Sequence, residues 1–163
     1  MFEINEAVIH YREGLSTIIG INQINGVDYF LLRVNKVNAE TIYVPIDTAS
    51  NIIRPIMSEK EADAVLKYIK GIKKDYNPNT KQRRDSYKRR LSSGEVKEIA
   101  YLYKQLGYYY QAGGENNTEI KLGPVDIEML NTAKNILLDE LALSYKVNRE
   151  DIDKYIEKRM KKL

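Results

Sequence analysis

The hydrophobic pattern of this 163-residue chain changes its period near Pro55, and that change limits the folds open to it. Before Pro55, apolar residues form short runs rich in Ile, Val, Tyr and Thr, a composition typical of strands. Asn25-Gly26 separates two of these runs and favours a hairpin turn, because both residues tolerate positive φ. The predicted strands are residues 7–10, 15–21, 27–34 and 41–46. Together they predict a small, strongly bent sheet or barrel of four or five strands.

After Pro55 the apolar residues recur at helical spacing. Ser58 and Glu61 fit a capping box at the start of the first helix. The sequence SSGE at residues 92–95 predicts a second capping box and a second helix start. Pro124, preceded by Gly123, predicts the start of a central helix, and residues 148–151 precede a last one. The fold class is therefore α+β: a small N-terminal bent β-sheet or barrel, followed by an all-α C-terminal bundle of four to five helices.

The positive charge of the chain is concentrated in one segment, residues 67–91. This segment carries ten Lys or Arg and two Asp, a net charge of +8, whereas the whole chain has a formal net charge of +3. Residues 80–91 contain no Gly or Pro and predict a short helix, in which like charges stack and repel one another. A run of phosphates would relieve that repulsion. An acidic protein partner and a merely solvated helix face are the alternatives.

The sequence offers little for catalysis or cofactor binding. It contains no cysteine and a single histidine, His10, so thiolate and most histidine-based metal sites are excluded. Phosphate-binding glycine motifs and HExxH are absent. Asp151 and Asp153 have the spacing of a metal pair, but acids at a helix start more often complement the helix dipole. We expect a non-enzymatic protein without cofactor or metal, and a metal-dependent nuclease is a distant alternative.

No signal peptide or apolar run of membrane-spanning length is evident, so we expect a cytoplasmic protein without a membrane partner. The run Tyr108 to Tyr110 could stack on bases, although such a run more often supplies one core tyrosine with two amphipathic neighbours.

Six short motifs, in order along nearly the whole chain, resemble those of the CarD/CdnL family of bacterial transcription regulators. They are FEINEAVIH (residues 2–10) followed by Gly14, YFLL (29–32), YVPID (43–47), IRPI (53–56), LSSGE (91–95) and DELAL (139–143). The resemblance implies a Tudor/SH3-like N-terminal module, residues 1–57, that binds the β subunit of RNA polymerase. Residues 58–163 would form a helical DNA-contacting domain, with residues 58–80 as the connecting helix and loop.

In that family the helical domain contacts promoter DNA at the upstream edge of the melted bubble and stabilises the open complex. The resemblance thus implies a monomeric, nucleoid-associated regulator that contacts DNA without reading its sequence. Polymerase is expected to bind an exposed strand edge formed by residues 18–23 and the neighbouring strand 42–44, with Asn22, Gln23, Ile42 and Tyr43 as contact residues. The expected DNA-contacting residues are Thr80, Lys81, Arg83, Arg84, Lys88, Arg89, Arg90 and Lys134.

The chain departs from the family pattern at the position of a tryptophan wedge. Counting back from the SG pair places Thr80 there, and the chain has no tryptophan. Tyr76 is a candidate substitute. Asp126 and Glu128 stand where relatives often carry basic residues. These differences make weak DNA affinity an expectation and leave a polymerase- or protein-binding adaptor without a DNA role as the alternative.

Overall fold

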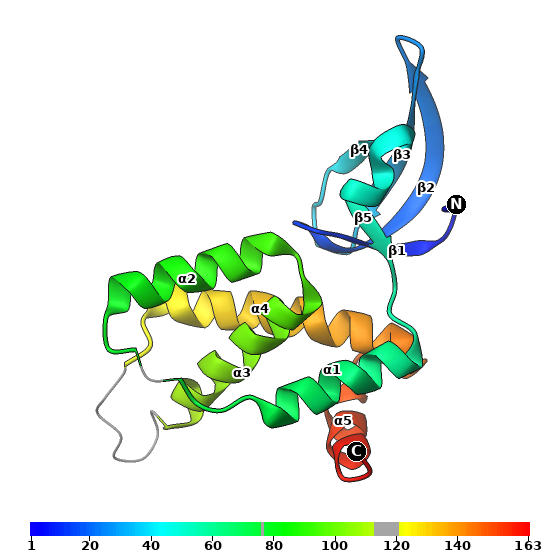
Figure 1. The fold of residues 1–163 in the computed structure, drawn as a ribbon. Helices are drawn as coiled ribbons and strands as arrows, with labels where there is room; N and C mark the ends of the chain where they lie inside the picture. Colours follow the sequence, from blue (N-terminus) through cyan, green and yellow to red (C-terminus); the bar gives the residue numbers. More distant parts are fainter. Residues whose placement is uncertain (76, 113–120) are drawn as a thin grey trace. The chain divides into compact units, whose positions relative to one another are not determined.

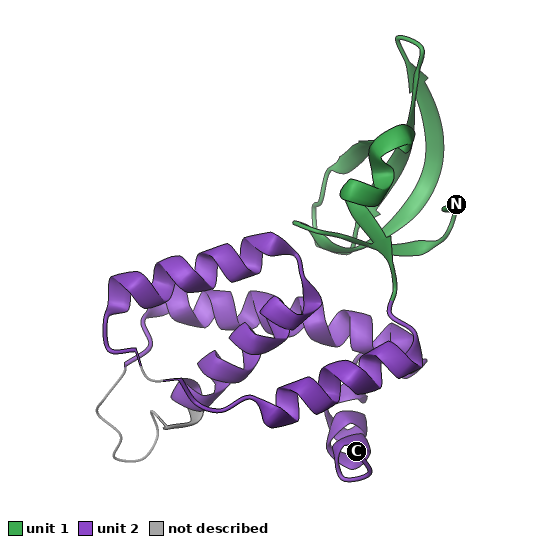
Figure 2. Ribbon diagram, viewed as in Figure 1, with its two compact units in different colours: residues 1–56 green, residues 57–163 purple. Residues whose placement is uncertain are grey.

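A computed structural model describes residues 1–75, 77–112 and 121–163. The chain divides into two compact units, residues 1–56 and residues 57–163 (Figure 2). Tyr76, the candidate substitute for the wedge, lies outside the described residues. The α+β fold class predicted from the sequence is confirmed: an antiparallel sheet is followed by helices (Figure 1).

The N-terminal unit is a five-stranded antiparallel sheet in the order β4-β3-β2-β1-β5. Its strands are β1 (Ala7–His10), β2 (Gly14–Ile24), β3 (Val27–Val34), β4 (Thr41–Pro45) and β5 (Ile53–Pro55), with a short 3-10 helix, η1 (Ile46–Asn51), before β5. The predicted turn is confirmed, since Asn25 and Gly26 have φ values of 50° and 80°. One face of the sheet forms the core, which contains Val8, Ile18, Phe30, Leu32, Val44 and Ile53.

Two details of this sheet differ from the prediction. First, β2 and β4 are not neighbours, because β3 lies between them and pairs with both. The expected edge made jointly by residues 18–23 and 42–44 is therefore wrong. Second, β2 continues to Ile24, three residues past its predicted end, because the tight turn at Asn25 keeps β2 and β3 paired to their ends.

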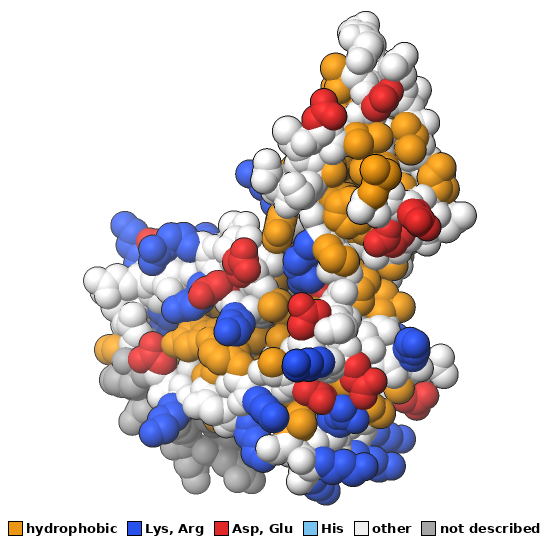
Figure 3. Space-filling view, turned by 45° about the vertical axis from the view of Figure 1, so that its right-hand side comes forward, with side chains coloured by type: hydrophobic (Ala, Val, Ile, Leu, Met, Phe, Trp, Pro, Cys, Tyr) orange, Lys and Arg blue, Asp and Glu red, His pale blue; other side chains and the backbone are white. Residues whose placement is uncertain are grey.

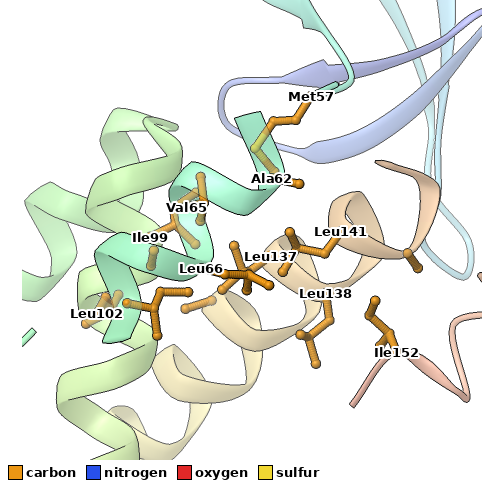
Figure 4. Close-up of a cluster of buried hydrophobic side chains, with 14 of the residues drawn as sticks. Met57, Ala62, Val65, Leu66, Ile99, Leu102, Leu137, Leu138, Leu141 and Ile152 are labelled. Carbon is orange, nitrogen blue, oxygen red and sulfur yellow. The ribbon is translucent and has the colours of Figure 1, made fainter. Parts of the chain in front are cut away.

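The described residues of the C-terminal unit form five helices, within the predicted number (Figure 1). They are α1 (Glu59–Gly71), α2 (Thr80–Ser93), α3 (Val96–Ala112), α4 (Pro124–Ser144) and α5 (Ile152–Met160). The core fills the space between α1, α3 and α4 and is closed by Ile152 of α5 (Figure 4). Leu66, Leu102 and Leu137 are among the fully buried side chains that join these helices. In the described part of the chain, no helix is long and apolar enough to cross a membrane.

The helix starts test the capping predictions. Ser58 and Glu61 form the predicted capping box, and Gly123 with Pro124 begins α4 as expected. The second predicted capping box is wrong. Ser92 and Ser93 are the last residues of α2, and Gly94 ends that helix in the left-handed conformation, with φ of 69°. The same four letters fit both roles, because a Ser-rich stretch suits a helix start and a glycine suits a helix end.

Candidate protein and nucleic-acid interfaces

The C-terminal half of β2 forms an open sheet edge. β1 pairs with β2 only over Gly14–Thr17, and the backbone of Ile18 bonds to Asn5 and Glu6. A register shift follows Ile18, and from Gly20 to Ile24 the strand pairs with β3. No described residue pairs with this part of β2 on its other side. An unpaired strand edge of this kind is a template for adding a strand from another chain.

Backbone geometry shows which groups this edge offers. A two-residue turn joins β2 to β3, so the flanking pair Ile24 and Val27 exchanges both backbone hydrogen bonds. Alternation from that pair directs the N–H and C=O groups of Ile21 and Gln23 away from β3. The edge is also apolar: Ile19, Ile21 and Ile24 are 39%, 52% and 42% exposed. Figure 3 shows hydrophobic side chains gathered on the surface of this unit.

The four predicted polymerase-contacting residues separate into two groups. Asn22 lies opposite Tyr29 in the register, and the Tyr29 and Tyr43 rings meet edge to face with centroids 6.4 Å apart. Asn22 and Tyr43 therefore share the face of the sheet opposite the core, joined through Tyr29. Tyr29 was not among the predicted contact residues, although it belongs to the YFLL motif and alternates with the buried Phe30.

The other two predicted residues are engaged inside the unit. Ile42 packs against the core, because it lies opposite the buried Leu32. The Gln23 side chain donates a hydrogen bond to Asp28 at 3.0 Å. The backbone of Gln23 faces the open edge, whereas its side chain stabilises the hairpin.

Helix α2 is held by more contacts than its composition suggests. Asn79 caps its first turn by accepting a hydrogen bond from the Gln82 N–H at 3.0 Å. Arg83 is 3% exposed and donates to the Asn77 carbonyl at 3.0 Å. Tyr87, one turn later, is also buried. Arg83 and Tyr87 therefore face the interior of the unit and pack α2 against it, although most of the helix is polar.

Arg84 is bound to the start of α4. Its Nε and Nη2 atoms lie 3.1 Å and 2.9 Å from the two carboxylate oxygens of Asp126, which is fully buried. Asp126 also accepts a hydrogen bond from the Gly123 N–H at 2.9 Å. Burial alone would raise the pKa of Asp126, but the hydrogen bonds from Arg84 and Gly123 outweigh it, so the pKa is lowered. Asp126, an unexpected acid at this position, is a structural partner of the basic helix.

Arg90 is also engaged within the unit. It forms an ion pair with Glu98 of α3, and its guanidinium lies 4.1 Å from the centroid of the Tyr101 ring. Of the predicted DNA-contacting residues on α2, this leaves Thr80, Lys81, Lys88 and Arg89 exposed. The three cations among them form no ion pair with a described residue, and nor does Lys134, which is half-buried on α4.

The tyrosines of α3 bind the segment between α1 and α2. Tyr108 donates a hydrogen bond to the Ile72 carbonyl at 3.0 Å, and Tyr109 donates to the Asp75 carbonyl. Gln105, fully buried and not singled out in the sequence, accepts from the Asp75 N–H at 2.9 Å. These hydroxyls hold the chain that leads into α2, so stacking on bases is left to the exposed Tyr110.

Among residues 1–75, 77–112 and 121–163, no group of three or more His, Cys, Asp or Glu side chains could hold a metal ion. Asp151 and Asp153 are exposed, with Asp151 at the N-cap of α5. His10 accepts hydrogen bonds at Nδ1 from the backbone N–H groups of Arg12 and Glu13, which gives it a structural role in a turn.

Comparison with family models matches both units. Residues 2–57 match the model described as "CarD-like/TRCF RID domain", and residues 64–157 match the model described as "CarD, C-terminal domain". A search of curated proteins returned no match.

Proposed function

The chain belongs to the CarD family of transcription-associated proteins that interact with RNA polymerase, and from this we propose that it regulates transcription by binding polymerase and promoter DNA together. In this proposal the Tudor-like N-terminal unit binds the β subunit. The helical unit contacts duplex DNA near the upstream edge of the bubble and changes the lifetime of the open complex. The protein acts by binding at the nucleoid and catalyses no reaction.

The open edge of β2 is the observation that carries the polymerase contact. It offers unpaired backbone groups at Ile21 and Gln23, flanked by exposed isoleucines. A strand of the β subunit added there would form main-chain hydrogen bonds, while the isoleucines would supply apolar contact area. Asn22, Tyr29 and Tyr43 would contact side chains of the same partner across the outer face.

The DNA contact draws its support from charge. Helix α2 has three exposed cations, Lys81, Lys88 and Arg89. Their charge suits contacts with phosphates, and the helix contains no motif for base recognition. Because Arg83, Arg84 and Arg90 are engaged inside the unit, the affinity of this helix for DNA is expected to be low. That observation favours, as a second candidate function, a polymerase-binding adaptor without a DNA role.

Capture of polymerase by the full chain tests the proposal. Ile21→Pro removes a backbone N–H that faces the open edge and leaves the β3 pairing intact, as proline does on edge strands. We expect it to abolish capture, whereas Ile21→Ala, which keeps the N–H, should retain part of it. Equal capture by wild type and Ile21→Pro would remove this edge from the proposal. Capture of polymerase without any binding of duplex DNA would favour the adaptor.

A further inference from the structure

A second basic surface lies away from α2, where α1 meets α5. It consists of five lysines, all exposed, and is called here the α1–α5 surface: Lys67, Lys70, Lys158, Lys161 and Lys162. The Lys70 ammonium donates to the Met160 carbonyl at 3.3 Å, so two segments ninety residues apart lie side by side. Lys and Arg side chains gather on this lower part of the helical unit in Figure 3.

Two acids of α1 near this surface, Asp63 and Glu59, are paired with Arg159 of α5. Arg159 binds both carboxylate oxygens of Asp63, at 2.9 Å and 2.7 Å, and also contacts Glu59 at 3.0 Å. Tyr145 donates a further hydrogen bond to Asp63 at 2.8 Å. The hydrogen bond from Arg159 is the main reason that the pKa of Asp63 is lowered. Arg159 thus offsets part of the negative charge of these two carboxylates, and none of the five lysines forms an ion pair with a described residue.

The two basic surfaces lie on different sides of the bundle. α2 packs on α3 and α4, whereas α5 packs on α1 and α4, and Figure 1 draws them on opposite sides of the unit. The α2 surface presents Lys81, Lys88 and Arg89 together with the exposed Asp85. The α1–α5 surface presents five lysines, with Glu157 as the one acid between Lys154 and Leu163. The α1–α5 surface is therefore the more positive of the two.

We propose that the α1–α5 surface binds the phosphate backbone of a nucleic-acid duplex, separate from any duplex on α2. A lysine is a flexible point charge that follows a phosphate chain without requiring a fixed geometry. Duplex DNA carries one charge per about 1.7 Å of its axis, which complements such a cluster. Binding to a membrane surface would call for apolar side chains beside the lysines. Among the described residues, α1 and α5 carry no exposed large hydrophobic side chain.

This proposal goes beyond the proposed function, because it does not require α2 to contact DNA. With both surfaces occupied, one chain would hold two duplexes. The test uses three matched double variants of the full chain, each of which loses two lysine charges. The first, called the α5 variant, combines Lys158→Gln with Lys162→Gln, and the second, called the α2 variant, combines Lys81→Gln with Lys88→Gln. The third, Lys104→Gln with Lys121→Gln, is a control outside both surfaces. Lys70 is left unchanged because of its bond to Met160.

Two measurements separate the outcomes. In the first, anisotropy of a labelled 20-base-pair duplex is followed against salt. The α5 variant should flatten the slope of log K against log salt by about two units, and the control by much less. In the second, a duplex fixed on beads captures a labelled free duplex through the protein. The slope tests the α1–α5 surface by itself, whereas bridging also needs the DNA contact proposed for α2. With that contact, wild type and control should bridge the two duplexes, and the α5 variant should lose bridging while still binding one duplex.

An unchanged slope with unchanged bridging in the α5 variant would overturn the proposal. So would binding of phosphatidylglycerol vesicles that the α5 variant loses while its DNA binding stays intact. If the α2 variant behaves like the control but the α5 variant loses binding, then the DNA contact proposed for α2 fails and the α1–α5 surface stands.

Discussion

Arg84 and Asp126 form a two-pronged ion pair, with N–O distances of 3.1 Å and 2.9 Å, that fixes the basic helix α2 to the first turn of α4. The pair explains why an arginine in the most basic segment of the chain is a poor candidate for DNA contact. Its guanidinium also fills the space over Gly123: a Cβ added to Gly123 would lie 2.8 Å from Nη2 of Arg84.

Loss of this pair should destabilise the helical unit. Arg84→Ala leaves the fully buried Asp126 carboxylate without its ion partner. We expect a loss of about 3 kcal/mol, the low end for breaking a buried pair, because Arg84 itself is partly exposed. Urea unfolding measures it. Arg89→Ala, on the exposed side of the same helix, is the control and should change stability by less than about 0.5 kcal/mol. A loss below about 1 kcal/mol in Arg84→Ala would mean that the pair is not important for stability.

DNA affinity of α2 should depend on its exposed cations and not on its buried ones. Replacing Lys81, Lys88 and Arg89 by Gln should flatten the salt slope of DNA binding by two to three units, at about 0.9 per phosphate contact. The protein should keep its stability. If affinity and slope both survive this triple change, the phosphate contacts lie elsewhere, and an acidic protein becomes the favoured partner of α2.

The aromatic ring of Tyr43 should contribute to the binding of polymerase. It is 49% exposed on β4 and contacts Tyr29 on the face opposite the core. Tyr43→Glu would place a charge in an apolar contact and should weaken capture by at least about tenfold, or 1.4 kcal/mol. Tyr43→Phe keeps the ring and is the matched control. Capture measured by surface plasmon resonance with immobilised polymerase distinguishes the two, and equal affinities would exclude Tyr43 from the interface.

The N-terminal unit should lose stability on acidification because of His10. Its Nδ1 atom accepts two backbone N–H groups, at 3.2 Å and 3.1 Å, and burial is the main cause that lowers its pKa. The unfolded chain therefore binds more protons than the folded one near pH 6, so stability rises with pH there. The contribution of His10 to the free energy of unfolding should be fully present above the pKa of about 6.5 that histidine has in the unfolded chain. It should decrease as the pH falls below that value.

The matched variant for this prediction is His10→Asn, whose side-chain oxygen can accept the same bonds without titrating. Urea unfolding at pH 7.5 and pH 5.5 should show a larger loss for wild type than for His10→Asn, by about 1 kcal/mol. Equal losses would mean that His10 does not control this pH dependence.

Local patterns in the sequence predicted most of the fold, because strand composition, the Asn25-Gly26 turn and the Ser58 cap act over a few residues. Pairing over longer distances was less visible. A count of formal charges treats Arg84 like Lys88, since nothing near Arg84 in the sequence points to Asp126, 42 residues away. For the same reason the sequence did not predict the contact between Lys70 and the carbonyl of Met160 at the end of α5. The predicted capping box at residues 92–95 was wrong for another reason. Serines are common at helix starts, but Gly94 equally favours a helix end, and the local sequence does not distinguish the two.

The position of Thr80 leads to the last prediction. Thr80 is the exposed first residue of α2, directly after its Asn79 cap, and the resemblance to the family places a tryptophan wedge there. An aromatic ring inserted at an opened base step stabilises a distorted duplex, which a small polar threonine cannot do. Thr80→Trp should therefore lengthen the lifetime of polymerase–promoter open complexes about fivefold, the scale of roughly 1 kcal/mol for one stacked ring. Decay after heparin challenge measures that lifetime. Thr80→Leu, apolar but not aromatic, is the comparison and should give a smaller gain, whereas no change in either variant would show that position 80 does not reach the opened step.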